Sequence, residues 1–107
     1  MDASDWRKTE NKRFIDALLA LKNREELERF LRDLLTKEEI EEFAMRFQVA
    51  ELLEADVPYS QIQKLTGLSS TTIARVSKWL KGDGGGYRTA IEHLHAHIKP
   101  SRGRALR

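Results

Sequence analysis

A short run of hydroxyl-bearing residues followed by two cations carries the groups of this chain best suited to recognition chemistry. The run comprises Ser69, Ser70, Thr71, Thr72, Arg75 and Lys78. Hydroxyl groups donate and accept hydrogen bonds, a threonine methyl can contact a thymine methyl, and an arginine can donate two hydrogen bonds to one guanine. These groups match the edges of base pairs in the major groove. If they lie on the outside of the helix, the sequence predicts a surface that binds double-stranded DNA.

The surrounding segment, residues 59–80, has the pattern of two short helices joined by a tight turn. Ser60 and Gln63 have the spacing of a reciprocal cap on the first helix. Gly67 is expected to end that helix because glycine adopts the left-handed conformation without steric penalty. Ser69 is placed to cap the second helix. One apolar seam should join the two helices: Ile62, Leu65, Leu68, Ile73, Val76 and Leu80.

This arrangement is typical of a helix-turn-helix, whose second helix enters the major groove and presents its N-terminal residues to base edges. The alternative is an ordinary helical hairpin with a polar outer face. Charge supports the first interpretation. Residues 1–58 carry 10 Lys+Arg against 15 Asp+Glu, whereas residues 59–107 carry 9 against 2. A basic half that contains the motif favours a polyanion as its partner, although such a division can also serve solubility alone.

Three amphipathic helices are expected before the motif. The first covers about residues 5–21, and the second opens at Asn23, with Glu26 three residues later. The third opens with the capping signature of Thr36 and Glu39 and continues to about residue 53. Their many large apolar side chains predict that residues 5–58 form a dimerisation core covered by a second chain. A self-contained monomeric bundle is the alternative.

The remaining segments complete a predicted single domain of residues 1–107. A glycine-rich loop is expected at residues 81–87, a short helix at 88–98, and a flexible basic tail at 99–107. His93 and His97 would share a face of that helix, and His95 would point elsewhere. We expect surface or packing histidines and no metal, because a structural zinc site needs four ligands and the chain has no cysteine.

Several function classes lack their usual sequence features. Without cysteine there is no disulfide and no thiol catalysis. Neither a phosphate-binding loop of the P-loop type nor a Ser, His and acid arrangement is present, so we expect no enzyme. No apolar run approaches the roughly 20 residues that span a bilayer, and the first residues lack the apolar segment of a secretion signal. A cytoplasmic protein without a membrane partner is expected.

Residues 34–80 resemble the tryptophan repressor family, most closely its YerC/YecD-type branch of regulators. The matching features are LLT followed by acids, an arginine inside the third helix, a Ser-Gln opening of the first motif helix and a Thr-Ile-x-Arg run in the second. The resemblance extends over roughly residues 10–98. It implies an all-α, six-helix fold, assembled as an intertwined homodimer, in which each chain presents a helix-turn-helix to operator DNA and represses transcription.

The resemblance also implies roles for particular residues. Gln61 and Lys64 would contact phosphates, the hydroxyls of residues 69–72 would face bases directly or through water, and Lys78 would add charge along the backbone. Arg75 has two interpretations. It either contacts DNA or braces the motif against the third helix through an acid such as Glu51.

The namesake of the family binds operator DNA only with tryptophan, and its pocket corresponds by position to Thr36, Arg46 and Arg75. Val76 replaces a glycine of the namesake, and Trp79 replaces a pocket serine, so both are expected to crowd or fill the cavity. The motif turn is also shorter by about two residues. We therefore expect DNA binding without tryptophan or any other cofactor. The alternatives are a small-ligand-dependent repressor and a helical protein-interaction module that does not bind DNA.

Overall fold

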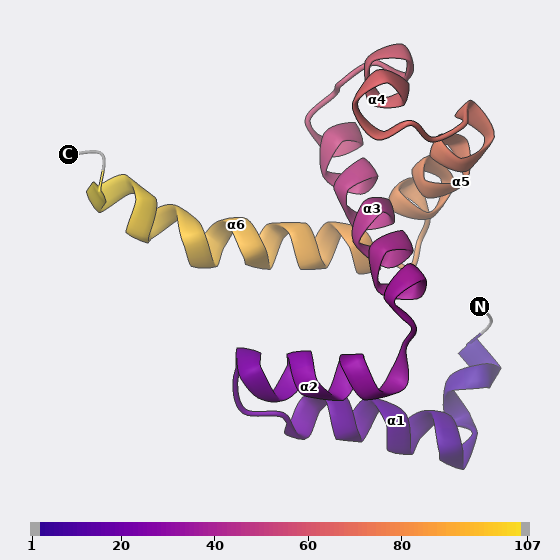
Figure 1. The fold of residues 1–107 in the computed structure, drawn as a ribbon, viewed down its shortest axis with the longest axis vertical. Coiled ribbons are helices and arrows are strands. Elements are labelled where there is room, and N and C mark those ends of the chain that lie inside the picture. Colours follow the sequence, from indigo (N-terminus) through magenta and orange to yellow (C-terminus); the bar gives the residue numbers. More distant parts are fainter. Residues whose placement is uncertain (1–2, 106–107) are drawn as a thin grey trace. The chain divides into compact units, whose positions relative to one another are not determined.

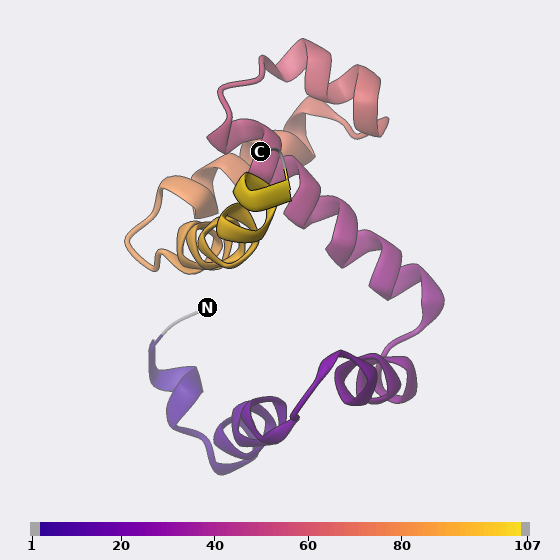
Figure 2. The ribbon, with the colours of Figure 1, turned by 90° about the vertical axis from the view of Figure 1, so that its left-hand side faces the viewer.

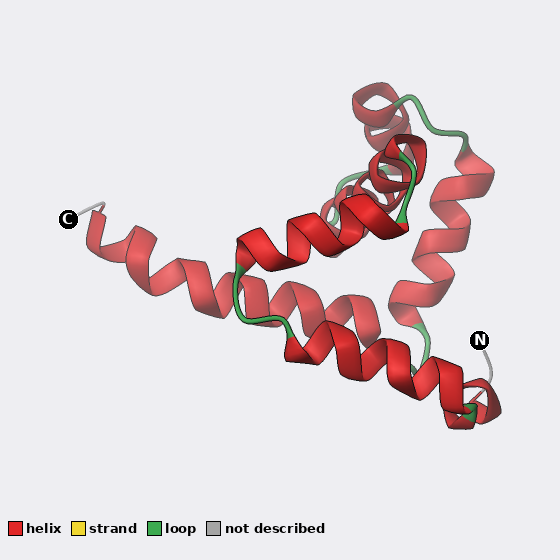
Figure 3. Ribbon diagram, turned by 60° about the horizontal axis from the view of Figure 1, so that its bottom comes forward, coloured by secondary structure: helices red, strands yellow, loops and turns green. Residues whose placement is uncertain are grey.

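The computed structural model describes the backbone of residues 3–105 and the side chains of residues 5–96. Helices and connecting loops account for all of this part of the chain, which contains no β-strand (Figure 3). The elements begin with η1 (Ala3–Arg7, a 3₁₀ helix). The α-helices, labelled in Figure 1, are α1 (Thr9–Ala20), α2 (Arg24–Leu34), α3 (Lys37–Glu54), α4 (Tyr59–Thr66), α5 (Ser70–Lys81) and α6 (Gly86–Ala105). The predicted all-α, six-helix fold class is confirmed.

The chain divides into two compact units, Met1–Ile40 and Glu41–Arg107. The first contains η1, α1, α2 and the start of α3. The second contains the rest of α3 together with α4, α5 and α6. The boundary falls inside α3, whereas the sequence predicts one domain subdivided after residue 58.

The first unit contains a break that the sequence does not predict. One helix is expected over about residues 5–21, but η1 and α1 are separate and meet at Lys8, whose backbone is extended, with ψ of 139°. The side-chain amide of Asn11 donates to the Asp5 carbonyl at 2.5 Å. This bond gives the Asp5 carbonyl a partner at the break between the two helices.

Both predicted caps of this unit are present. The Asn23 side chain accepts the Glu26 amide hydrogen at 3.0 Å and opens α2. At the start of α3, the Glu39 amide donates to the Thr36 hydroxyl at 3.1 Å, and the Thr36 amide donates to the Glu39 carboxylate at 2.9 Å. These reciprocal bonds form the predicted capping box, and they satisfy amides that the first helical turn leaves free.

The helices of the first unit lack a core of their own. A short link joins α1 to α2 (Figure 2), and the rings of Phe14 and Phe30 approach to 6.3 Å between centroids. None of residues 5–40 is buried. Large apolar side chains remain exposed instead: Trp6, Phe14, Leu19, Leu27, Leu34 and Ile40. The apolar faces predicted from the sequence therefore exist, but this chain alone does not cover them.

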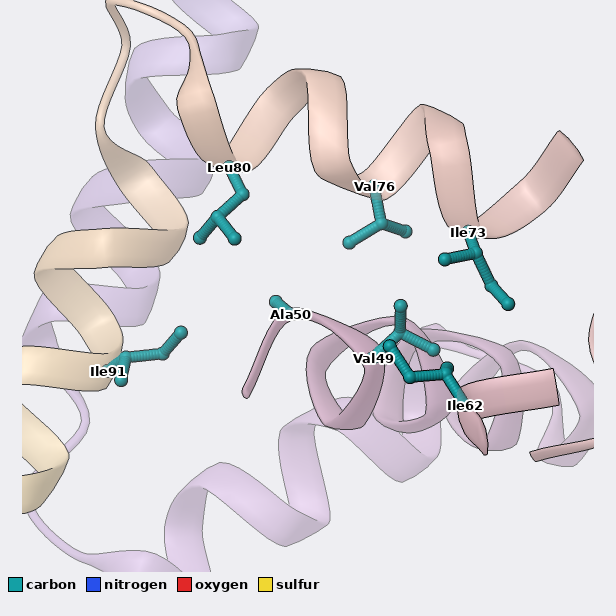
Figure 4. Packing of buried hydrophobic residues seen from close by; sticks show 7 residues of the cluster. All are labelled: Val49, Ala50, Ile62, Ile73, Val76, Leu80 and Ile91. Atoms are coloured by element: carbon teal, nitrogen blue, oxygen red, sulfur yellow. The ribbon is translucent and has the colours of Figure 1, made fainter. Parts of the chain in front are cut away.

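The second unit is built around one apolar cluster to which all four of its helices contribute. The buried members, drawn in Figure 4, are Val49, Ala50, Ile62, Ile73, Val76, Leu80 and Ile91. The predicted seam is thus largely present, and Leu68 packs partly buried against it. Leu65 is an exception, since 59% of its surface is exposed. Ile62 and Thr66, four residues apart, turn inward on α4, which leaves Leu65 beside the buried face.

The end of α3 is fixed by a left-handed residue that is not glycine. Asp56 has φ of 63°, and its amide bonds to the Leu53 carbonyl at 3.0 Å. The Val57 amide bonds to the Leu52 carbonyl at 3.0 Å. This pair of bonds is a Schellman motif, which satisfies the last carbonyls of α3 and directs the chain towards α4.

The C-terminal helix differs from the predicted one at both ends. A loop is expected at residues 81–87 and a helix at 88–98, but α6 extends from Gly86 to Ala105. Gly85, with φ of 70°, reverses the chain, and its carbonyl accepts the Thr89 amide hydrogen at 2.9 Å, so the helix starts at once. The helix then continues where a flexible tail is expected, because each residue added to an existing helix contributes a hydrogen bond. Residues 106–107 lie outside the described part.

Candidate nucleic-acid interface

The turn between α4 and α5 is closed by the chain's own hydrogen bonds. Gly67 has φ of 75°, and its amide donates to the Gln63 carbonyl at 2.8 Å. The Thr66 hydroxyl donates to the Ile62 carbonyl at 2.7 Å and accepts the Leu68 amide hydrogen at 3.2 Å. The predicted role of Gly67 is confirmed. Thr66, which no sequence pattern singles out, holds the other side of the turn.

Ser69 caps α5 as predicted. Its hydroxyl accepts the Thr72 amide hydrogen at 3.2 Å and lies 3.1 Å from the Thr72 hydroxyl. These two side chains are thus engaged with each other, and Thr72 is partly buried. Ser70 and Thr71 are exposed at the same turn. The N-terminus of α5 also carries the positive end of the helix dipole, which favours an anion such as a phosphate.

The predicted cap of α4 is wrong. The helix begins at Tyr59, one residue before Ser60, and no side chain caps it. The Pro58 carbonyl accepts the amide hydrogens of Gln61 and Ile62, both at 3.0 Å. Pro58 is the N-cap residue, with extended backbone (φ −63°, ψ 150°), and proline has no amide hydrogen that would need a partner there. Ser60 therefore lies inside the first turn.

Every residue predicted to contact DNA lies on α4, on α5 or at the turn between them. All are exposed except the partly buried Thr72: Gln61, Lys64, Ser69, Ser70, Thr71, Arg75 and Lys78. Among the described side chains, the ion pairs are those of Arg24 with Glu28 and of Arg46 with Glu42. One interpretation of Arg75 is that it braces the motif against α3 through Glu51. No ion pair between the two residues supports it within this part of the chain.

A cavity of about 460 Å³ lies beside α5 within the second unit. Its lining combines apolar, aromatic and charged side chains: Glu42, Met45, Arg46, Leu68, Thr72, Arg75, Val76, Trp79 and Tyr87. The prediction that Val76 and Trp79 would crowd or fill this space is correct only in part, because both side chains line it but a cavity remains. Val76 also belongs to the apolar cluster, with 3% of its surface exposed, whereas 53% of the Trp79 surface is exposed.

Two of the three predicted pocket residues, Arg46 and Arg75, line this cavity. Arg46 forms an ion pair with Glu42, and its guanidinium lies 5.6 Å from the centre of the Phe43 ring. Thr36 belongs to the first unit, where its hydroxyl caps α3. The cavity can thus offer a cationic group beside aromatic surface.

The described residues give little support to metal binding or to a membrane-spanning helix. No group of three His, Asp or Glu side chains there is placed to hold a metal ion. His93 and His95 are exposed, and the side chain of His97 lies outside the described part. No helix in the described part is long and apolar enough to cross a membrane.

Residues 9–95 match the sequence profile of the Trp repressor protein family. The chain belongs to the Trp repressor family. This confirms the resemblance inferred from its motifs, and the family is one of transcription regulators rather than enzymes. The protein YerC of Bacillus subtilis, which is uncharacterized, is 34% identical over 94 residues, covering 88% of this chain and 90% of YerC.

Solved structures of this Trp repressor type agree with the fold. A TrpR-like protein from Eubacterium eligens is 33% identical, with a TM-score of 0.78 over 85% of this chain and 94% of its own. A candidate Trp repressor from Staphylococcus aureus is 32% identical, with a TM-score of 0.80 over 89% of this chain and 95% of its own. The six-helix arrangement is thus shared with solved members of the family.

Proposed function

We propose that this protein is a sequence-specific DNA-binding transcriptional regulator, acting as a repressor, that places the first turn of α5 in the major groove. The observation that carries the proposal is the exposure of Ser70 and Thr71 at a helix start whose cap and turn are fixed by internal hydrogen bonds. A rigid turn presents hydroxyls to base edges in one orientation, which sequence recognition requires.

The proposed contacts divide into two kinds. Gln61 and Lys64 on α4 bind phosphates and set the register of the protein, as does Lys78 on α5. Ser70 and Thr71 read base edges, directly or through water. Arg75, which is exposed on the same helix, contacts DNA next to them. Phosphate contacts supply affinity for any sequence, whereas base contacts discriminate between sequences.

Ser69 and Thr72 have a different part in this proposal. Their hydroxyls bond to each other, and the Ser69 hydroxyl also accepts the Thr72 amide hydrogen, so the pair holds the start of the helix. A hydroxyl already engaged in this way can accept a further hydrogen bond from a base or a water molecule. We therefore retain both at the interface, chiefly as residues that position Ser70 and Thr71.

We also propose that the protein acts as a homodimer, intertwined through its first unit. The exposed apolar side chains of that unit include Leu19, of which 78% is exposed, Leu34 and Trp6. Burying one such leucine contributes about 1.5–3 kcal/mol. A dimer in which a second copy covers these faces would therefore be strongly stabilised relative to two separate chains. Twofold symmetry would then place two α5 helices on half-sites about one helical turn apart.

A second candidate, a repressor that needs a small ligand, is favoured by the cavity beside α5. Its walls include Arg46, Arg75 and the indole of Trp79, groups suited to an aromatic carboxylate. We prefer DNA binding without tryptophan because the turn before α5 is already closed by the bonds of Gly67, Thr66 and Ser69. A ligand is not needed to set that geometry.

A titration of fluorescently labelled random duplex tests the proposal. It is performed at several salt concentrations, with and without excess tryptophan, while light scattering gives the mass in solution. We expect a dimer whose affinity falls steeply with salt and is unchanged by tryptophan. A gain on adding tryptophan would support the ligand-dependent repressor. No binding even at low salt would contradict both and support a protein-interaction module.

A further inference from the structure

The C-terminal end of α5 is held by a contact from α6. The last carbonyls of any helix lack partners within it. At the end of α5, the Gly82 amide donates to the Trp79 carbonyl at 3.3 Å, and the Arg88 guanidinium donates through Nη1 to the Leu80 carbonyl. Arg88 is partly buried, so water competes only weakly for this bond. The recognition helix is thus bonded to the helix that follows it.

Leu80 of α5 is also held through its side chain. Leu80 is 4% exposed and Ile91 of α6 is 3% exposed, and both belong to the apolar cluster shown in Figure 4. Ile91 lies three residues after Arg88, so the two side chains leave neighbouring positions of one helix face. The first turns of α6 therefore hold Leu80 by its carbonyl and by its side chain together.

The loop between the two helices is shaped for this contact. Gly85 has φ of 70°, a conformation that other residues rarely adopt, and it turns the chain just before α6. A Cβ added at Gly85 would lie 3.3 Å from Nη2 of Arg88, so a larger residue would press on the guanidinium. Gly84 differs, since a Cβ there would have no atom within 4 Å.

The charge of Arg88 suits its position. A helix carries partial negative charge at its C-terminus, and a cation there is favourable. A guanidinium also keeps its charge and several donors in a fixed plane, whereas a lysine ammonium is a more hydrated point charge. The contact thus combines directional hydrogen bonding with an attraction that arginine supplies better than lysine.

We propose that Arg88 is a positioning residue for DNA recognition, and this inference rests on the proposed function. By binding the Leu80 carbonyl, Arg88 fixes the angle between α5 and α6 within the second unit, and so the depth at which Ser70 and Thr71 meet base edges. The Ser69 cap restrains the opposite end of α5. Base contacts depend on that angle more than phosphate contacts do, because phosphates line the duplex at regular intervals whatever its sequence.

The test compares full-length variants on two duplexes, one selected from a random pool by the wild-type protein and one random. Arg88→Met removes the donors but keeps an unbranched side chain, and Arg88→Lys restores a charge and a donor. We expect Arg88→Met to lower affinity for the selected duplex roughly tenfold and to leave affinity for the random duplex and the salt slope unchanged. Arg88→Lys should recover part of the loss.

A pair of glycine variants gives a second measurement that leaves the charge of the protein intact. Gly85→Ala should reproduce the selective loss, because it strains the loop and displaces the guanidinium, whereas Gly84→Ala should bind like the wild type. Circular dichroism at the titration temperature confirms that each variant compared is folded. If Arg88→Met fails to fold, a smaller selective loss in Arg88→Lys, together with the comparison of Gly85→Ala with Gly84→Ala, decides the inference.

The remaining outcomes separate the inference from the function on which it rests. An equal fall in affinity for both duplexes, with a salt slope smaller by about 0.9 for each phosphate no longer neutralised, would show that Arg88 binds phosphate and would overturn a positioning role. Unchanged binding of Arg88→Met and Gly85→Ala would also overturn it while leaving DNA recognition intact. Failure of the wild type to bind either duplex would overturn the proposed function and this inference together.

Discussion

The hydroxyl oxygens of Ser69 and Thr72 lie 3.1 Å apart, and the Thr72 amide donates to the Ser69 hydroxyl at 3.2 Å. This pair closes the first turn of α5, and Ser70 and Thr71 between them are exposed. Neighbouring hydroxyls that look alike in the sequence therefore have different surroundings. Two hold the helix, and two are free to contact a partner, which leads to separate predictions for stability and for binding.

Replacing Ser69 by alanine should lower the free energy of unfolding by about 1 kcal/mol, because the α5 amides lose their capping oxygen. Ser70→Ala is the matched control, since Ser70 is exposed and its change should stay within about 0.5 kcal/mol. Denaturant unfolding followed by circular dichroism measures both. Equal effects of the two substitutions would mean that the cap does not contribute to stability.

Replacing Thr71 by alanine should change which sequences are preferred, with little effect on stability. The substitution removes a hydroxyl and a methyl from the first turn of α5, and such base contacts are each worth about 1–3 kcal/mol of discrimination. Selection from a random duplex pool, performed with variant and wild type, measures the preference. Thr72→Ala should also alter it, because Thr72 helps to place the helix start. Unchanged selections by both variants would refute the assignment of α5 as the recognition helix.

Replacing Lys64 by glutamine should weaken binding to every duplex by the same factor. Lys64 is exposed on α4, and removing one cation that neutralises a phosphate should reduce the slope of log affinity against log salt by about 0.9. Lys12→Gln, an exposed lysine of the first unit, serves as the control and should leave the slope unchanged. A change in sequence preference without a change in slope would assign Lys64 to base recognition instead.

Substitutions at two positions with left-handed backbone should change the free energy of unfolding in opposite directions. Asp56 has φ of 63°, so Asp56→Gly should raise the free energy of unfolding by about 1 kcal/mol. Gly67 has φ of 75° and open space around it, so Gly67→Ala should lower that free energy by about 1–2 kcal/mol through backbone strain alone. Thermal and denaturant unfolding test both. Destabilisation by Asp56→Gly would show that the aspartate side chain contributes more than its backbone costs.

Replacing Leu19 by glutamate should dissociate the proposed dimer. Leu19 is 78% exposed on α1, so the substitution is tolerated within one chain but would place a charge in an apolar interface between two chains. Light scattering gives the mass of the variant beside that of Lys12→Gln, the same control as above. If the mass of Leu19→Glu depends on protein concentration as that of the wild type does, the interface lies away from α1.

The features that the sequence predicts correctly depend on neighbours close in the chain. The caps at Asn23, Thr36 and Ser69 each join a side chain to an amide three residues later, and Gly67 acts through its own φ. Such signals are contained in a few residues, so no knowledge of the rest of the fold is needed. The helical periodicity of the apolar seam is similarly local, and most of that seam is buried.

The features that the sequence does not predict depend on geometry that short patterns do not contain. Pro58, rather than Ser60, is the residue that immediately precedes α4, and Trp79 lines a cavity that it is expected to fill. The bond from Arg88 to the Leu80 carbonyl crosses a loop whose direction depends on the φ of Gly85. Only the packed arrangement of α5 and α6 shows that Arg88 and Leu80 meet.

The ratio of affinities for a selected and a random duplex, measured at physiological salt, tests the central claim most directly. The claim is that α5 of a dimer reads base sequence. It predicts a ratio of at least about 10³, the lower end for specific DNA-binding proteins, that falls for Thr71→Ala but not for Lys64→Gln. Equal affinity for the two duplexes, or no measurable binding to either, would contradict it.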